Sequence, residues 1–229
     1  MGKKNKQLFK ERINLRDYDV LLRELSEAFD KGNEFLFEKL FGSTKLELYA
    51  DRGTYAFGQH QLCDGIKFSE NRNFTEKRLC KCMYYFNSPY KKRCKRCSFT
   101  KRFKINNESE YKITDYEVPA YYYGSGIGEI DLIISKDGIN YATEVKPYKG
   151  NRETILRMIA EIMTYTAGSD KYKKAIAFFE INRENGNKSA QQSEYENASP
   201  ELLALIKKAD ITVFRFEECG ENEYKICKL

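Results

Sequence analysis

The first part of the chain carries a helical hydrophobic pattern. From Asp17 onward, apolar residues recur three and four positions apart and form one stripe, which consists of Val20, Leu21, Leu25, Ala28 and Phe29. Gly32 interrupts the stripe, and residues 34–41 fit a second short helix. Residues 45–75 follow no clear period and leave room for two short strands.

The second half alternates between strand and helix patterns. Apolar-rich strand runs cover residues 112–123, 128–135, 141–148, 173–181, 211–217 and 223–229. Asp137-Gly138 is a turn signal between the second and third runs. A helix is predicted over 152–168, residues 182–199 read as a polar loop, and Ser199-Pro200 opens another helix with an N-cap and a first-turn proline. The order αβββαβαβ predicts an α/β fold with a mixed central sheet and helices against its faces.

Composition agrees with a folded, soluble chain. Its 229 residues suit one domain with an insertion, and 41% hydrophobic with 32% charged residues can bury a core. No apolar run has the length of a membrane span, and the N-terminus has no signal-like hydrophobic segment. We therefore expect a cytoplasmic protein without a membrane partner.

Positive charge is concentrated in one stretch. The formal net charge is +6, yet residues 77–107 contain eleven Lys or Arg and no Asp or Glu, so the rest of the chain sums to 6 − 11 = −5. A separated basic stretch favours a polyanionic partner, although a solvated charged loop is the simpler alternative. We expect the following residues to contact a nucleic-acid backbone: Lys91, Lys92, Arg93, Lys95, Arg96, Lys101, Arg102 and Lys104.

Three charged residues stand on strands that otherwise look buried. Asp131 lies among the apolar residues of run 128–135, and Glu144 and Lys146 share one face of run 141–148. A hairpin places Asp131 near Glu144, where two carboxylates repel each other unless a cation such as Mg²⁺ or Mn²⁺ binds them. Lys146 can then hold a water or offset charge on a phosphate. A salt-bridge ladder on an edge strand is the alternative.

These residues resemble the hallmark of the PD-(D/E)XK nuclease superfamily, in GEID at 128–131 and EVK at 144–146. The resemblance covers residues 111–182 and, by element order alone, the first helix. It implies a restriction-endonuclease-like αβββαβ core in which Asp131, Glu144 and the Val145 carbonyl bind the metal. It also implies that Lys146 positions the attacking water or stabilises the transition state, and that the products carry 5′-phosphate and 3′-hydroxyl ends.

Further acidic residues are weaker candidates. RecB-like and Cas4-like members carry Gln-x-x-x-Tyr on the following helix, where this chain has Glu161 and Tyr165. The tyrosine matches and the glutamine does not, which leaves this subgroup open; a core Tyr165 with Glu161 paired to Arg157 is the alternative. Other candidates for an additional acid are Glu117, Glu129, Glu24 and Glu27.

Four cysteines have the spacing of a zinc site. Cys80-x-Cys82 and Cys94-x-x-Cys97 supply two close pairs across a short loop, as in tetrahedral Zn²⁺ sites. Four unrelated thiols, a pair replaced by His60 and Cys63, and an iron–sulfur cluster are the alternatives. All four cysteines precede the nuclease-like segment, which favours structural zinc.

Together these patterns predict a metal-dependent DNA endonuclease that serves restriction, defence or DNA processing. The predicted divisions are a basic tail (1–16), a helical part of the nuclease domain (17–60), a zinc-binding basic module (61–104) and the nuclease core (105–229). The resemblance also implies a homodimer, because many relatives that cut both strands are dimers. A non-catalytic nucleic-acid-binding module and an RNA nuclease remain as alternatives, and the sequence separates neither DNA from RNA nor endonuclease from exonuclease action.

Overall fold

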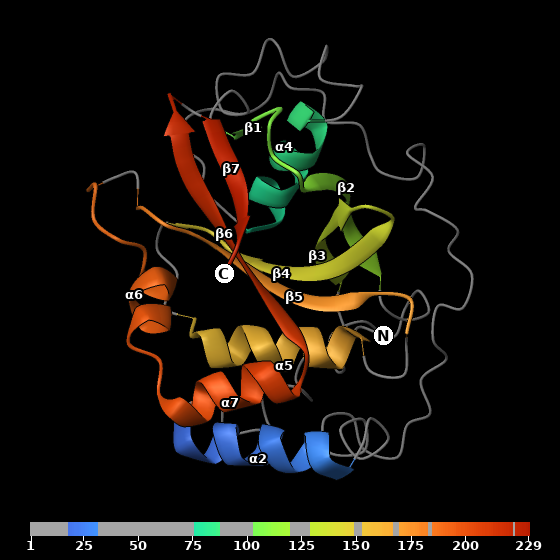
Figure 1. The fold of residues 1–229 in the computed structure, drawn as a ribbon, viewed down its shortest axis with the longest axis vertical. Helices are drawn as coiled ribbons and strands as arrows, with labels where there is room; N and C mark the ends of the chain where they lie inside the picture. Colours follow the sequence, from blue (N-terminus) through green and yellow to red (C-terminus); the bar gives the residue numbers. More distant parts are fainter. Residues whose placement is uncertain are drawn as a thin grey trace, which may run out of the picture.

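A computed structural model of the chain describes residues 18–31, 76–87, 103–119, 129–148, 153–166, 170–182, 185–221 and 223–229. These residues form a mixed α/β fold around one seven-stranded sheet with strand order β1-β7-β6-β5-β4-β3-β2 (Figure 1). Its strands are β1 (Lys104–Ile105), β2 (Lys112–Pro119), β3 (Glu129–Lys136), β4 (Ile139–Lys146), β5 (Lys173–Phe179), β6 (Ile211–Gly220) and β7 (Glu223–Lys228).

The β3–β4 hairpin fixes the register on which the charged residues depend. Lys136 pairs with Ile139, which leaves Asp137 and Gly138 as a two-residue loop. Both loop residues have positive φ, 51° and 79°. This is the conformation that a tight hairpin turn requires and that Asp-Gly supplies at low cost. The turn signal read from the sequence is therefore confirmed.

Parallel pairing extends the sheet beyond this hairpin. β2, β3 and β4 form an antiparallel meander, while β4, β5 and β6 run parallel. The helix α5 (Ile155–Thr166) makes the crossover from β4 to β5. β7 returns antiparallel beside β6, and β1 pairs parallel with β7.

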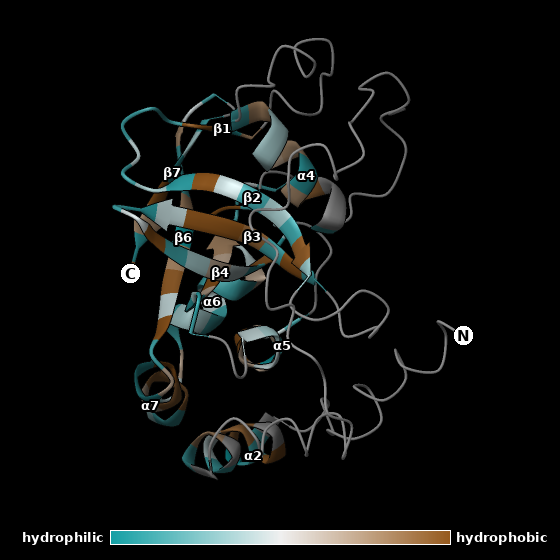
Figure 2. Cartoon of the chain, turned by 90° about the vertical axis from the view of Figure 1, so that its right-hand side faces the viewer, coloured by the Kyte–Doolittle hydropathy of each residue, from teal (hydrophilic) through white to brown (hydrophobic). Residues whose placement is uncertain are grey.

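Helices cover both faces of the sheet. The helix α4 (Glu76–Asn87) packs on β2 and β3, and its Leu79 and Met83 are buried with Leu132 and Ile134 of the sheet. On the other face lie α5 and α7 (Pro200–Lys208), and α2 (Tyr18–Lys31) packs outside them (Figures 1 and 2). The sheet thus separates two apolar cores.

Most predicted strands and helices are present, but two helices were not foreseen. The predicted polar loop 182–199 contains α6 (Ala190–Glu196), whose N-cap Ser189 accepts a hydrogen bond from the Gln192 N–H at 3.0 Å. The expectation of a loop there is therefore wrong over α6. The helix predicted over 34–41 and the strands expected within 45–75 lie outside the described residues.

The position of α4 differs from its predicted surroundings. The sequence analysis assigned this segment to a zinc module, whereas α4 shares its buried side chains with the sheet. Helices of the described ranges include none that is both long and apolar enough to cross a membrane.

Candidate metal centre

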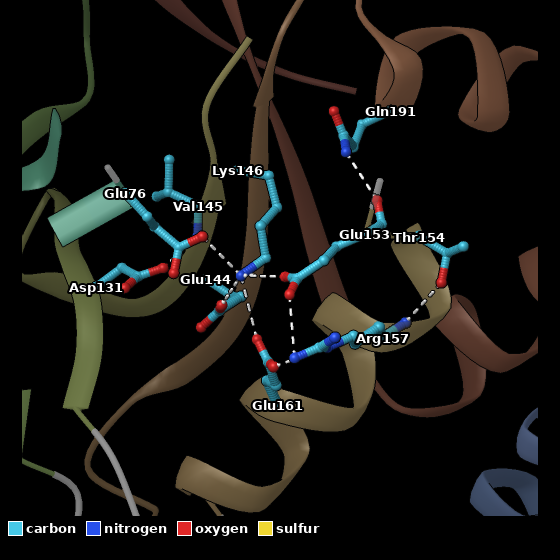
Figure 3. A network of polar contacts seen from close by, with 10 residues as sticks. All are labelled: Glu76, Asp131, Glu144, Val145, Lys146, Glu153, Thr154, Arg157, Glu161 and Gln191. Carbon is cyan, nitrogen blue, oxygen red and sulfur yellow. Dashed lines mark hydrogen bonds and ion pairs between the residues drawn. The ribbon is translucent and has the colours of Figure 1, made fainter. Parts of the chain in front are cut away.

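Three carboxylates converge from three different elements. Glu76 is the first residue of α4, Asp131 lies near the start of β3 and Glu144 near the end of β4. One oxygen from each lies within 4.8 Å of the other two (Figure 3). The structure thus brings Asp131 and Glu144 together, as the hairpin predicted, and adds Glu76.

Asp131 is held where the backbone ladder between β3 and β4 stops. The last paired residues are Leu132 and Thr143. Asp131 is the neighbour of Leu132 beyond this last pair. Its Oδ2 accepts a hydrogen bond from the Val145 N–H at 2.8 Å, so the side chain takes over where the backbone ladder ends. Because the N–H and C=O of a strand residue point toward the same neighbouring strand, the Val145 carbonyl points to the β3 side as well. This placement is compatible with the ligand role expected for that carbonyl.

Lys146 lies at the centre of the site. Its side chain is 2% exposed, and its ammonium donates to Glu144 Oε1 at 2.5 Å and to Glu76 Oε2 at 2.8 Å. On its other side it contacts Glu153 Oε2 at 2.9 Å and Glu161 Oε2 at 3.2 Å (Figure 3). One buried cation is therefore surrounded by four carboxylates from three elements and the segment that leads into α5.

Arg157 completes the network on α5. It lies four residues from both Glu153 and Glu161, so it shares a face of α5 with Glu161 and also reaches Glu153 in the segment before the helix. Its Nη2 is 3.0 Å from Glu153 Oε1, and its Nε donates to Glu161 Oε1 at 3.1 Å. The Arg157–Glu161 pair that the alternative interpretation gave is therefore present, and Glu161 also reaches the site through Lys146.

The site holds more negative than positive charge. The five carboxylates of Glu76, Asp131, Glu144, Glu153 and Glu161 face two cations, Lys146 and Arg157. Burial raises the pKa of the Glu144 carboxyl, and the nearby Asp131 raises it further. Burial, then Glu76, raises the pKa of Asp131 in the same way. Without another cation, the protein therefore favours protonated forms of these acids.

Lys146 and Glu161 keep their charges, in contrast to Asp131 and Glu144. Burial alone lowers the pKa of Lys146, but the carboxylates of Glu144 and Glu161 outweigh it and leave the pKa above the ordinary lysine value. Burial raises the pKa of Glu161, but its contacts with Glu144 and Lys146 outweigh burial and lower that pKa overall. Lys146 therefore remains an ammonium, and Glu161 remains its carboxylate partner.

The residues present fit a divalent metal. Oε2 of Glu144 is buried, and no hydrogen-bond donor of the described residues reaches it. A buried carboxylate oxygen without a donor is costly unless a cation binds it. The group offers carboxylate oxygens, which are the ligands that Mg²⁺ and Mn²⁺ prefer. Glu76, Asp131 and Glu144 therefore form a candidate site for such a cation.

The weaker candidates divide into near and distant residues. Tyr165 is half-buried and packs against the core on the α5 face, and burial, followed by the charge of Glu144, raises the pKa of its hydroxyl. Glu117 has a positive φ of 46°, and the pairs on both sides of it in the β2–β3 ladder place it opposite Asp131. Glu129, Glu24 and Glu27 are outside the convergent acidic group.

Glu76 was missed because its segment was interpreted through its cysteines. Leu79, Cys80 and Met83 follow Glu76 at three, four and seven positions, which is the spacing of one helix face. That signal was sufficient to predict a helix there. The contact of Glu76 with Asp131 depends on tertiary packing across 55 positions of sequence, and local periodicity does not encode it.

The cysteine half-motif lies on α4. Cys80 and Cys82 are both buried there, and residues two apart in a helix project about 200° apart. Burial, and then the charge of Asp131, raises the pKa of the Cys80 thiol. This geometry does not favour both thiols as ligands of one ion. Cys94 and Cys97 lie outside the described residues, so the four-cysteine zinc site stays a prediction.

Most of the expected nucleic-acid contacts also lie outside the described residues, namely Lys91, Lys92, Arg93, Lys95, Arg96, Lys101 and Arg102. Lys104 is described, in β1. Its ammonium is 3.0 Å from Glu223 Oε1, and its side chain is 44% exposed. Lys104 is thus partly neutralised by β7, which weakens its case as a phosphate contact.

Comparisons with known proteins add little to this description. No family profile and no curated protein matches the sequence. One solved structure, that of SfsA from Pyrococcus furiosus in complex with Ca²⁺, aligns at 16% identity with a TM-score of 0.27. The alignment covers 52% of this chain and 55% of that one, so this chain spans about half the length of its neighbour. A likeness this low carries no argument about fold or function.

Proposed function

We propose that this chain is a metal-dependent nuclease of the PD-(D/E)XK superfamily with a restriction-endonuclease-like core. The observation that carries the proposal is the convergence of Glu76, Asp131 and Glu144 beside the buried ammonium of Lys146. Charged groups buried together are expensive for a fold. Such an arrangement is common where a protein binds a metal or catalyses a reaction.

The element order supports the same proposal. α4 precedes the meander β2-β3-β4, which is followed by α5 and the parallel strand β5. Apart from the two-residue strand β1, this is the αβββαβ order of the superfamily, with α4 as the first helix. Asp131 and Glu144 occupy β3 and β4, the second and third strands of the meander, where the superfamily hallmark belongs.

The residues suggest how the reaction proceeds. A divalent cation held by Glu76, Asp131 and Glu144 would supply Lewis-acid polarisation of a phosphate and would lower the pKa of a water. The carboxylates around Lys146 hold its pKa above the ordinary lysine value, so its ammonium donates hydrogen bonds in the site. Its ammonium orients the attacking water or offsets negative charge on the phosphate. Glu161 and Arg157 keep it in place.

The remaining features extend the proposal. DNA is the proposed substrate, bound through the basic stretch 91–104, with 5′-phosphate and 3′-hydroxyl products. A homodimer is part of the same proposal, whereas the positions of Cys80 and Cys82 on α4 do not favour the predicted structural zinc at the four cysteines. DNA in preference to RNA rests on the superfamily resemblance.

Cleavage of supercoiled plasmid tests this function. The wild-type protein, Glu144→Gln and a control, Glu110→Gln, are incubated with EDTA, Mg²⁺ or Mn²⁺. Glu110 is an exposed carboxylate paired with Lys136 outside the acidic group, so its variant controls for the loss of one charge. We expect metal-dependent nicking or linearisation by the wild type and control, and none by Glu144→Gln. Equal cleavage by Glu144→Gln rejects the site, and salt-dependent DNA binding without cleavage supports a binding module instead.

A further inference from the structure

A positive charge of the protein already occupies part of the candidate metal centre. Lys146 Nζ is 2.5 Å from Glu144 Oε1 and 2.8 Å from Glu76 Oε2. These are two of the three carboxylates that converge there. The ammonium therefore already neutralises two of the acids that a divalent cation would use.

The same ammonium has a second set of partners away from the convergent carboxylates. Glu153 Oε2 and Glu161 Oε2 lie 2.9 and 3.2 Å from it, and neither residue belongs to the convergent group. Arg157 binds the other oxygen of each and fixes their positions. Lys146 can therefore leave Glu76 and Glu144 and still keep its ion pairs with Glu153 and Glu161.

We propose that Lys146 is a built-in competitor for the metal site, which releases Glu76 and Glu144 and stays with Glu153 and Glu161 when a divalent cation binds. The proposal rests on the proposed metal site. It explains why Lys146 has more acidic partners than one ion pair requires. It also gives Glu153 and Glu161 a role as positioning residues that hold the displaced ammonium.

The competition has a specific consequence for metal affinity. Part of the binding free energy of the metal is spent on separating Lys146 from two carboxylates. Removing the ammonium should therefore raise metal affinity, although it removes a group that the reaction needs. A lysine that only orients the substrate has no such effect on the metal.

Titration calorimetry with Mn²⁺ alone, in the absence of nucleic acid, measures this effect. The variants are Lys146→Met and a matched control, Arg157→Met. Both substitutions remove one positive charge from the same network, but only Lys146 contacts Glu76 and Glu144. We expect Lys146→Met to bind Mn²⁺ at least about tenfold more tightly than the wild type, and Arg157→Met less than about threefold, because the more distant and partly exposed charge is better screened.

The outcomes separate this proposal from the proposed function. Unchanged or weaker binding by Lys146→Met, with wild-type binding intact, overturns the competition and leaves the metal site standing. Equal gains in both variants also overturn it, because they reflect general charge removal. No Mn²⁺ binding by any variant rejects the metal site, and the competition with it.

A second substitution guards against misfolding. Met cannot satisfy the four carboxylates around position 146, so circular dichroism and a thermal transition accompany each titration. Lys146→Gln keeps hydrogen-bond donors without the charge and should also bind Mn²⁺ more tightly than the wild type. If Lys146→Gln folds and binds with wild-type affinity, the competition is rejected whatever the state of Lys146→Met.

Discussion

Glu144 and Lys146 are the two residues whose burial most needs an explanation. Side chains alternate across β4, so both lie on the face that also carries the buried Ala142 of the α5 core. Apolar residues of similar volume would pack there at lower cost, because burying charges requires their desolvation. Their presence is therefore better explained by the chemistry of a site than by stability of the fold.

Glu76 is the acidic residue on which the structure and the sequence-based prediction differ. In the sequence, Glu24 or Glu27 of the first helix were candidates for an additional acid, whereas in the structure Glu76 joins Asp131 and Glu144. We predict that Glu76→Gln lowers Mn²⁺ affinity by more than about tenfold and reduces cleavage accordingly. Glu27→Gln, an exposed change on α2, should leave both near wild type. The reverse result would return the site to the N-terminal helix.

The raised carboxyl pKa values also predict how stability depends on pH. Burial raises the pKa of Glu76, Asp131 and Glu144 in the folded state, so folding favours their protonated forms. Stability present below the ordinary carboxyl pKa should therefore be lost as the pH rises through the raised values. The lowered pKa of Glu161 acts in the opposite sense. With three groups against one, we predict that the metal-free protein becomes less stable as the pH rises above the ordinary carboxyl range.

Urea unfolding in EDTA at a series of pH values measures this loss. Saturating Mn²⁺ should flatten the profile, because it binds the ionised carboxylates. Glu144→Gln should also be flatter than the wild type in EDTA. A metal-free protein whose stability rises with pH above the ordinary carboxyl range contradicts the assigned pKa directions.

The grouping of Asp131, Glu144 and Lys146 was predictable at this scale, and their partners were not. Alternation along two strands and a two-residue turn are local properties, and they were sufficient to place Asp131 beside Glu144 and to point Lys146 to the same face. The surroundings of Lys146 depend on α4 and on the segment that leads into α5, which only the tertiary structure brings together.

Among the elements, the start of α5 is secured from another helix. The Ile155 N–H donates to Glu194 Oε2 at 2.9 Å, and Gln191 Nε2 of α6 donates to the Glu153 carbonyl at 2.8 Å (Figure 3). Burial raises the pKa of Glu194, and its hydrogen bonds with the start of α5 partly offset this. α6 thus fixes the segment from which Glu153 contacts Lys146.

Glu194 acts as an N-cap supplied by a neighbouring helix. We predict that Glu194→Ala lowers the free energy of unfolding by roughly 0.5–2 kcal/mol, as loss of a cap does, and also reduces cleavage. Ser199→Ala removes the N-cap of α7, where Ser199 Oγ accepts from Leu202 N–H at 3.2 Å. Its stability loss should be similar, with cleavage unaffected. Urea unfolding and plasmid cleavage on both variants provide the comparison, and equal effects on cleavage would remove the special role of α6.

The sequence did not predict α4 and α6, and the reason differs between the two helices. α6 is short and polar, and it is stabilised by the Ser189 cap and by burial of Gln191 and Gln192, neither of which produces a hydrophobic period. α4 has such a period, but its close-spaced cysteines favoured a metal-binding loop. The strands were easier, because runs of β-branched and aromatic residues between turn signals are strong local patterns.

For the whole molecule, the sheet organises two cores and one site. α4 covers one face and α5 the other, and the acidic group lies where the first residue of α4 meets the ends of β3 and β4. Since α4 carries the candidate ligand Glu76 and part of the core, folding and formation of the acidic group are coupled.

Met83 tests whether α4 belongs to the main folding unit or to a separate zinc module. It is fully buried with sheet residues. We predict that Met83→Ala lowers the free energy of unfolding by about 2–5 kcal/mol within a single urea transition. If residues 61–104 fold as an independent zinc module, two transitions should appear, and zinc chelation should abolish only one of them. The unfolding curves with and without a zinc chelator distinguish the two cases.

Anomalous diffraction from crystals grown with Mn²⁺ tests the central claim most directly. The account predicts an anomalous peak in bonding contact, about 2.0–2.2 Å, with oxygens of Glu76, Asp131 and Glu144, and Lys146 shifted toward Glu153 and Glu161. A saturated crystal with no peak at these carboxylates, or with its Mn²⁺ bound elsewhere, would contradict the assignment of this site as the metal centre of a nuclease.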